Sequence, residues 1–533
     1  MSDHATTYER MIDREVTKVL GAIPLLLPFL ETLGLREVIN QTLVSVNDVD
    51  NGTVALVLCL NRLLAPRPLY RVEDWLAETI LPEYLGIDAA KLHDDRLGRF
   101  LDDLEPHLDR IWQTLSLRAL EHYQVDLSVL LYDLTSIYFE GEYADNAAVT
   151  YGYSRDHRPD CKQRVIGLDV TGHEGIPVLY QLLAGNTADC TTPQANLQRL
   201  RNFLNFLPCP PRWPLLVRDQ VLVSAEVFVR ASQQEIFLLG PLDSRLVAHQ
   251  RLLAEVSAEE LRQHPLAYRA QHAKPTDPVP YFGIGRDTSF TAELDGASVI
   301  VPGKLLVVLS ESKARLDQER RQVQIAKNEH ALADMAAKLN QRRYKQRDYV
   351  LQRLAQVQQG NAAKRLFDVT LTEEDGQFVL TYHLNAERLA QEEAQDGKYL
   401  VGTTDLSLTH DAIFARSKLR DRIEKRMGMV KGPLRVRPLF VQTEARIRGL
   451  VFLTLVALLV FSLLELELAR AQRPQTARAA LETFAPLRAV DLFFRDGSRL
   501  RRASNLTPNQ GEMLALLQLP PPQTYLTMHL LRC

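Results

Sequence analysis

The stretch Leu127-Ser-Val-Leu-Leu-Tyr-Asp-Leu-Thr-Ser-Ile-Tyr-Phe139 is rich in aliphatic and aromatic residues. A run that is apolar on both alternating faces is typical of a central strand covered on both sides, not of a strand with one face in water. One acid, Asp133, interrupts this run. A lone carboxylate inside a buried strand is costly unless it is paired, hydrogen-bonded or bound to a cation. We therefore predict a functional acid at Asp133.

Downstream of this strand, the sequence predicts a meander followed by crossovers. The predicted elements are strands over 163–171 and 176–183, a helix from Thr192-Pro193, a strand over 215–219 that ends in Asp219, a helix from Ser224 and a strand over 235–239. Three consecutive strands followed by parallel crossovers predict an α/β protein and match the ribonuclease H-like fold. In that order the first and fourth strands lie side by side, so Asp133 and Asp219 are expected to meet.

A basic helix is predicted over residues 419 to 431, where Glu424 sits among five basic side chains. At roughly 100° per residue, Arg420, Glu424 and Lys431 fall within about 60° of one another. One stripe of the helix thus presents a cation, a carboxylate and a cation. Gly432-Pro433 is expected to end the helix through a left-handed cap. Charge runs are usually solvated faces, so an ion pair is the alternative to a metal ligand at Glu424.

The composition of the 533 residues is ordinary for a globular protein of two to four domains, with 46% apolar and 24% charged residues. A net charge of -3 does not by itself predict nucleic-acid binding. The local balance does, since residues 416–448 hold eleven Lys or Arg and three acids. Five scattered cysteines without CxxC spacing exclude a zinc ribbon and a disulfide framework. We expect a reduced, cytoplasmic protein.

No signal-peptide pattern opens the chain, and one apolar run is long enough to consider as a membrane span. This run, Gly449 to Leu464, would extend over about 24 Å as a helix, against a hydrocarbon core of about 30 Å. We predict a buried helix of a soluble protein and no membrane partner.

Three converging carboxylates, Asp133, Asp219 and Glu424, would repel one another unless a cation neutralised them. Hard oxygen ligands with open positions suit Mg²⁺ or Mn²⁺. Two such ions about 4 Å apart activate an attacking water or 3′-hydroxyl and stabilise the leaving oxygen of a phosphodiester. The helix that carries Glu424 is expected to bring it to the edge of the sheet where the two aspartates meet.

Three segments of the chain resemble the DDE transposases of bacterial insertion sequences, and within them the insertion-sequence four group. They are Leu-Tyr-Asp-Leu-Thr-Ser at 131–136, Asp-Gly-Lys-Tyr-Leu-Val-Gly-Thr-Thr at 396–404, and Ile-Glu of the basic helix followed by Arg-Pro at 437–438. The resemblance extends from about residue 40 to the C-terminus. The spacing Arg420-x3-Glu424-x6-Lys431 matches the group's signature Arg, Glu and Lys.

Two positions depart from the group's pattern. Its signature Tyr is Ser417 here, and Gln220-Val221 stand where relatives carry Arg-Gly after the second Asp. Ser417 lies seven residues before Glu424, so on one helix it would share the stripe of Glu424. We expect Phe414, one turn earlier, to be the nearest aromatic that could stack on a flipped base.

The resemblance implies a ribonuclease H-like core that uses two Mg²⁺ ions, with Mn²⁺ as a substitute. Asp133 would bridge both ions, Asp219 would hold one and Glu424 the other. Arg420 and Lys431 would hold phosphates of the DNA end, and Arg416 and Arg437 are further predicted DNA contacts. The implied partners are the terminal inverted repeats, target DNA and a second copy of the chain, at the bacterial nucleoid. A nuclease of the same fold, and a decayed or domesticated copy that binds DNA without cutting it, remain alternatives.

Five domains are predicted. The first is a helical N-terminal domain over 1–125, which is either a small helical domain without an assigned role or a domain for DNA-end or dimer contacts, with isolated cations such as Arg62, Arg67 and Arg71. The others are the first part of the core over 126–241, an inserted α+β domain over 242–395, the second part of the core over 396–472 and a C-terminal tail over 473–533. The insertion is predicted because 204 residues separate Asp219 from Glu424. Its long helical middle spans 310–359, with strands over 365–371 and 376–382, and the tail is expected to end in a helix near 509–519.

Overall fold

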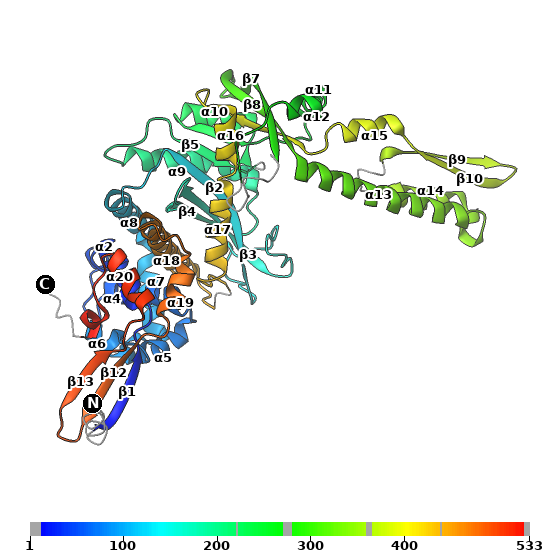
Figure 1. Cartoon of the computed structure of the whole chain (residues 1–533). Coiled ribbons are helices and arrows are strands. Elements are labelled where there is room, and N and C mark those ends of the chain that lie inside the picture. The colour runs from blue at the N-terminus through cyan, green and yellow to red at the C-terminus, as the bar shows by residue number, and fades with distance from the viewer. Residues whose placement is uncertain (1–11, 220–221, 270–279, 359–364, 438–439, 527–533) are drawn as a thin grey trace. The chain divides into compact units, whose positions relative to one another are not determined.

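The computed structural model describes residues 12–219, 222–269, 280–358, 365–437 and 440–526. The chain divides into two compact units, one formed by Met1–Val217 and Leu419–Cys533 and the other by Arg218–Lys418. Each unit combines helices with β-strands, so the chain is α/β as predicted (Figure 1).

The first unit is built around one apolar helix, α18 (Glu444–Arg470). The Thr443 side chain caps it by accepting the backbone N–H of Arg446. Every residue from Gly449 to Leu464 is buried, which confirms the predicted buried helix. By length and composition α18 could cross a membrane, but 89% of its most apolar 18-residue window is buried inside the protein.

Helices of the N-terminal segment cover α18 and bury its aliphatic side chains, each of which contributes about 1.5–3 kcal/mol when fully buried. Helices α2, α4, α7 and α8 all pack against it. Polar contacts fix the same interface, since Arg446 Nε lies 3.0 Å from Asp102 Oδ2 on α7. The helices of this segment are α2 (Ile23–Thr32), α3 (Leu35–Thr42), α4 (Asn51–Leu64), α5 (Val72–Ala77), α6 (Leu81–Leu85), α7 (Asp94–Leu104) and α8 (Leu108–His122).

The sheet of the first unit has β2 (Val129–Phe139) between two neighbours, in the order β4-β3-β2-β5. The predicted meander is confirmed, because β2 pairs antiparallel with β3 and β3 pairs antiparallel with β4. The predicted neighbour relation of the first and fourth strands is also confirmed by this order. The other elements of this segment are β3 (Lys162–Thr171), β4 (Pro177–Ala184), α9 (Thr192–Asn205) and β5 (Leu215–Arg218).

A second, three-stranded sheet joins the two ends of the first unit and was not predicted. Strand β1 (Ile12–Val19) pairs with β12 (Arg488–Phe494), which pairs with β13 (Arg499–Ala503). The predicted helical N-terminal domain over 1–125 therefore contains a strand, β1, and the predicted C-terminal tail over 473–533 supplies two strands of this sheet. The remaining elements of the tail are α19 (Ala477–Phe484) and α20 (Pro508–Leu516), the latter at the predicted final helix.

The second unit carries its strands in the order β6-β11-β8-β7. Strand β6 (Phe237–Pro241) was predicted from its apolar run, and β11 (Lys398–Thr403) lies antiparallel between β6 and β8. The long hairpin of β7 (Tyr281–Leu294) and β8 (Ala297–Ser310) was missed, because its strands lie inside the segment assigned to an insertion. The helices beside these strands are α10 (Ala225–Gln233), α11 (Val247–Glu255), α12 (Ala258–Arg262) and α16 (His410–Ser417).

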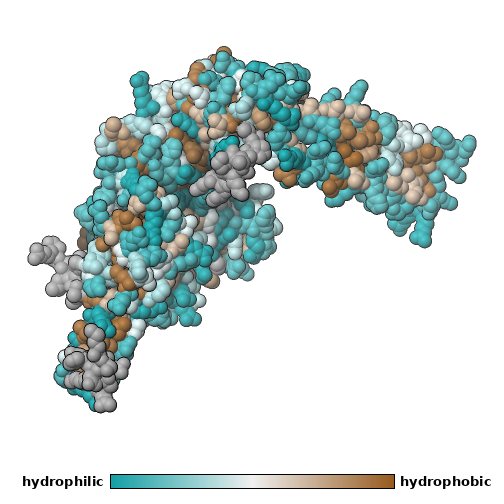
Figure 2. Space-filling view, in the orientation of Figure 1, coloured by the Kyte–Doolittle hydropathy of each residue, from teal (hydrophilic) through white to brown (hydrophobic). Residues whose placement is uncertain are grey.

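An arm extends within the second unit from the end of β8, as Figure 1 shows. It holds α13 (Glu311–Lys338), α14 (Arg347–Gln358), α15 (Ala386–Glu393) and the hairpin of β9 (Phe367–Glu374) and β10 (Gln377–Leu384). The arm has its own small core, which includes Leu332, Met335, Leu339, Val350 and Leu354. Brown patches in Figure 2 mark hydrophobic residues at its surface, and Leu316, Val323 and Leu351 are exposed.

The compact units do not follow the predicted domain boundaries. The N-terminal helices share one unit with β2, β3, β4 and α18, because α18 packs against both the N-terminal helices and β4. The second unit spans Arg218–Lys418, wider than the predicted insertion at 242–395. Strand β11 and helix α16 pack with the β7–β8 hairpin, and β6 pairs with β11.

Asp491 on β12 ties the small sheet together, since Arg501 Nε lies 2.6 Å and Arg499 Nη2 2.7 Å from its carboxylate. Burial opposes its charge, but the hydrogen bonds from Arg501 and Arg499 outweigh burial and lower the pKa of Asp491 to about 2. A carboxylate whose pKa falls on folding stabilises the fold above its unfolded pKa of about 3.9. That stability is lost as the pH falls through the folded pKa.

We predict that Asp491→Asn lowers the free energy of unfolding at pH 7 by about 2 kcal/mol. Urea unfolding between pH 7 and pH 2 measures the effect, and the difference between variant and wild type should shrink as the pH falls from about 4 towards 2. Asp13→Asn, at an exposed position of β1, is the matched control. A constant difference across this pH range would contradict the assignment.

Candidate active site

Asp133 lies on β2 as predicted, and it is the first half-buried position in a strand whose preceding four residues are buried. It stands opposite Leu168 of β3, and its Oδ1 accepts the backbone N–H of Leu134 at 2.8 Å. The side chain therefore retains access to the surface while its strand lies in the core. A carboxylate in this position is held rigidly and can still reach a ligand.

Glu424 lies on α17 (Arg420–Lys431), which packs against β2 within the first unit. Ile423, Met427 and Val430 are buried on one face of α17. Glu424 points to solvent, with 58% of its side chain exposed, and its Oε1 lies 3.7 Å from Nη2 of Arg420. Arg420 and Glu424 thus lie on one stripe of the helix, as predicted, and they form the ion pair that was the alternative to a metal ligand. Asp133 and Glu424 lie on neighbouring elements, and metal binding by Glu424 stays a prediction.

Asp219 directly follows the last residue of β5, as predicted, and is half-buried. It belongs to the second unit, whereas Asp133 and Glu424 belong to the first. The meeting of all three carboxylates stays a prediction. Gln220-Val221, the departure after the second Asp, lies outside the described residues.

Helix α17 ends at Lys431 as predicted, but its C-terminal cap differs from the predicted one. The φ of Gly432 is −90°, so the predicted left-handed cap is wrong. The following loop is tied back to the helix instead, because the backbone N–H of Leu434 donates to the carbonyl of Met429 and that of Val436 to the carbonyl of Val430, at 3.1 and 3.0 Å.

Two of the predicted DNA-binding cations share one acid that sequence reasoning missed. Lys431 Nζ lies 2.8 Å from Asp156 Oδ1, and Arg437 forms an ion pair with the other oxygen of Asp156. The Arg437 guanidinium also stacks over the ring of Tyr138 on β2, at 5.1 Å from its centroid. Burial lowers the pKa of Lys431. Together the two cations and Asp156 carry one net positive charge, and their contact with DNA stays a prediction.

The prediction that Ser417 shares a helical stripe with Glu424 is wrong. Helix α16 ends at Ser417 and α17 begins at Arg420, with a two-residue turn between them. Phe414 is also wrong as a base-stacking residue, because its side chain is 0% exposed. It packs against Tyr281 and Tyr268 of the same unit, with ring centroids 4.7 and 5.3 Å away.

Several basic side chains of residues 416–448 form ion pairs within the protein, so fewer of them are available to DNA than the composition indicates. Arg416 lies 3.9 Å from Asp405 and Lys425 lies 2.7 Å from Asp421. Arg426 is buried, and its guanidinium donates to the carbonyl oxygens of Gly175 and Glu174 at 2.8 Å and pairs with Glu465 of α18. Arg426 thus fixes α17 to the β3–β4 turn and to α18, so it is a structural cation.

A second buried acid, Asp169 on β3, was also missed. It is 2% exposed, and its Oδ2 accepts a hydrogen bond from Asn196 Nδ2 on α9 at 2.7 Å. Asp169 is a lone acid in a buried strand, as Asp133 is, so the same sequence pattern predicts it. Asp156 had no such signal, because it lies in an irregular segment between strands.

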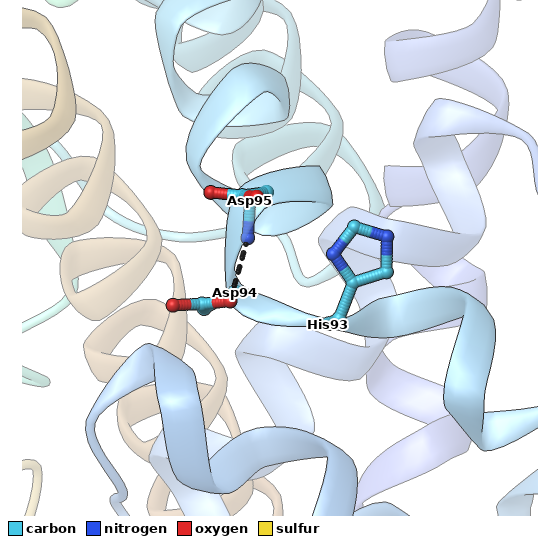
Figure 3. A group of neighbouring side chains, drawn as sticks. All are labelled: His93, Asp94 and Asp95. Carbon is cyan, nitrogen blue, oxygen red and sulfur yellow. Dashed lines mark hydrogen bonds between the residues drawn. The ribbon is translucent and has the colours of Figure 1, made fainter.

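His93, Asp94 and Asp95 are close enough to hold a cation, with one ligand atom of each within 4.8 Å of the others (Figure 3). All three are exposed, and Asp94 Oδ1 accepts the backbone N–H of Asp95 at 3.0 Å. They begin α7, where acidic side chains offset the positive end of the helix dipole. This role accounts for the group without a metal.

Comparison with known proteins gives one family match. Residues 15–117 match a family described as a domain of unknown function, DUF4277. This range holds most of β1 and the helices α2 to α8 down to residue 117. No curated protein matches the chain.

A cryo-EM structure of the piggyBac transposase synaptic complex with hairpin DNA is similar at 9% sequence identity and a TM-score of 0.39. The similarity covers 88% of this chain and 82% of that chain. At this level the similarity does not show a shared fold.

We predict that Asp156→Asn lowers the free energy of unfolding by about 2 kcal/mol, because it leaves two partly buried cations without their acid. Chemical denaturation at neutral pH measures the loss. The control is Asp160→Asn, an exposed acid of the same loop paired with Arg158, which should cost less. Equal losses in the two variants would show that Asp156 does not fix Lys431 and Arg437.

Proposed function

We propose that this chain is a DDE transposase with a ribonuclease H-like core, which binds the terminal inverted repeats of an insertion sequence and catalyses cleavage and strand transfer. The observation that carries the proposal is Asp133. It is an acid with access to the surface on a core strand, and the helix that packs on this strand presents Glu424 to solvent. The resemblance of the surrounding segments to the insertion-sequence four group supports the same function.

In this proposal Asp133, Asp219 and Glu424 hold two Mg²⁺ ions, or Mn²⁺. The donor set fits, because accessible carboxylates are the hard oxygen ligands that these ions prefer. When bound, such ions lower the pKa of an attacking water and neutralise charge on the leaving oxygen. The chain's own part is to keep Asp133 fixed on β2 and Glu424 on a helix anchored by Arg426.

The proposed reaction has two steps. Water attacks a phosphorus at the transposon end, and the P–O3′ bond breaks to release a 3′-hydroxyl and leave a 5′-phosphate. That 3′-hydroxyl then attacks a target phosphodiester, forming a new P–O3′ bond and releasing the 3′-hydroxyl of the target strand. One phosphodiester forms as one breaks in the second step, so no nucleotide cofactor is needed. We propose that two copies of the chain act together on the paired ends, in the cytoplasm at the nucleoid.

Asp133→Asn, Asp219→Asn and Glu424→Gln should each reduce Mg²⁺-dependent cleavage of a labelled terminal-repeat duplex to background, because each removes a metal ligand. DNA binding and the melting temperature should stay close to wild type. Asp421→Asn, an exposed acid on the same helix as Glu424, is the control and should retain cleavage. Cleavage near the wild-type rate in one of the three variants would remove that residue from the site.

A strand-transfer assay with Mg²⁺ separates the proposal from its alternatives. Cleavage without joining would favour a nuclease of the same fold. Binding without cleavage would favour a decayed or domesticated copy.

The variant Asp156→Asn should bind DNA more tightly than wild type, although it is less stable. Loss of the acid frees Lys431 and Arg437 for phosphates, and each added phosphate contact steepens the dependence of log K on log salt by about 0.9. Fluorescence anisotropy on a duplex at several salt concentrations measures the slope. Asp160→Asn changes the net charge equally and should leave the slope near wild type; equal slopes in both variants would show that Lys431 and Arg437 do not reach DNA.

A further inference from the structure

A pocket of about 220 Å³ lies within the first unit, between the C-terminal end of α4 and the segment that follows α17. Four arginines line it, two from each side: Arg62 and Arg67 from α4 and the residues after it, and Arg435 and Arg437 from the segment after α17. No acid belongs to the described lining. A liquid water occupies about 30 Å³, so the space accommodates a group several times larger than water.

Arg62 is the buried member of this pocket, with 5% of its surface exposed. Among the described residues its side chain makes one hydrogen bond, from Nη1 to the carbonyl oxygen of Arg435 at 3.3 Å, and no ion pair. Burial lowers the pKa of Arg62 to about 10. A guanidinium has five N–H donors, and a buried charge is costly unless it is paired. No acid in the described part of the chain pairs with this buried guanidinium, so its charge is open to an anionic ligand.

Arg67 and Arg435 add two exposed cations at the same pocket. Neither forms an ion pair within the described part of the chain, whereas Arg437 is engaged by Asp156. Arg435 has a φ of 44°, a conformation that is unfavourable for residues other than glycine. Strained residues of this kind gather at ligand sites, where the surrounding structure fixes them.

Phe440 lines the same pocket, and 59% of its surface is exposed. An exposed aromatic beside unpaired arginines is the combination that nucleic-acid sites use, since the cations hold the phosphate and the ring stacks on a base. Free phosphate has no base to stack on an aromatic ring, so Phe440 favours a nucleic acid as the ligand.

We propose that this pocket binds a backbone phosphate of DNA, held by Arg62, Arg67 and Arg435, with the adjoining base or sugar against Phe440. This inference rests on the proposed function and extends it to residues outside the catalytic triad. It also gives a role to the region that matches DUF4277, because Arg62 and Arg67 lie within residues 15–117.

The pocket is connected to α17, so a phosphate bound in it would be positioned relative to Glu424. The segment that carries Arg435 is bonded to the last turns of α17 through Leu434 and Val436. A phosphate fixed at Arg435 is thereby held at a set position relative to the helix of Glu424. The pocket would place the DNA strand for the reaction without taking part in the chemistry.

The test uses the full-length chain and a fluorescein-labelled 30-base-pair duplex of arbitrary sequence. In the double variant Arg67→Gln/Arg435→Gln, log K should fall less steeply with log salt. The magnitude of the slope should decrease by about 1.8, which is about 0.9 for each lost phosphate contact. Its control, Arg110→Gln/Arg212→Gln, removes the same charge at exposed positions of the first unit and should leave the slope near wild type. Both pairs are exposed, so neither variant is expected to unfold.

The outcomes separate this inference from the proposed function. If wild type binds the duplex and the two double variants have the same slope, the pocket assignment fails while the transposase proposal stands. If wild type does not bind duplex DNA at any salt concentration, both fail.

Phe440→Ala tests the identity of the ligand. Loss of a stacked base weakens single-strand binding by roughly five- to a hundredfold, so the variant should bind a duplex with an unpaired 3′ overhang at least fivefold more weakly. A blunt duplex should lose less, because its bases are stacked on one another. Unchanged affinity for the overhang would overturn the contact with Phe440.

Discussion

The burial of α18 is the constraint on which the first unit depends. Its apolar residues from Gly449 to Leu464 have no polar face to present to water, so helices from the N-terminal segment, strand β4 and helix α17 must cover it. Segments separated by more than 300 residues therefore share one core. This arrangement explains why the N-terminal helices do not form a domain of their own.

The same core orients the candidate site. Arg426 joins α17 to α18 through Glu465 and to the β3–β4 turn through backbone carbonyls, while the apolar face of α17 packs on β2. With that face fixed, Glu424 and Arg420 must point outwards beside the strand that carries Asp133. The cationic loop after α17 extends this surface towards α4, where Arg62 and Arg67 add charge from a distant part of the sequence.

Local patterns predicted the parts of the fold that depend on local physics. Buried apolar runs gave β2, β3, β4 and α18, and the end of α17 followed from Gly432-Pro433. The predictions that failed concern residues whose structure depends on partners far away in the sequence. Strand β1 is stable as a strand only through its pairing with β12, nearly 500 residues away, and the engagement of Lys431 with Asp156 requires a loop whose path no periodicity indicates. The predicted stripe required one helix through Ser417 and Glu424. The chain instead forms two helices, because α16 ends at Ser417 and α17 begins at Arg420.

We propose that Asp133 belongs to a metal-binding active site. Mn²⁺ binding to the full-length protein in the presence of duplex DNA, followed by electron paramagnetic resonance, tests it without an assay of cleavage. We expect Asp133→Asn to lose the bound Mn²⁺ and the combined variant His93→Ala/Asp94→Asn/Asp95→Asn to keep it. Retention of Mn²⁺ by Asp133→Asn, with its loss in the combined variant, would place the metal at the start of α7 and remove Asp133 from the metal site.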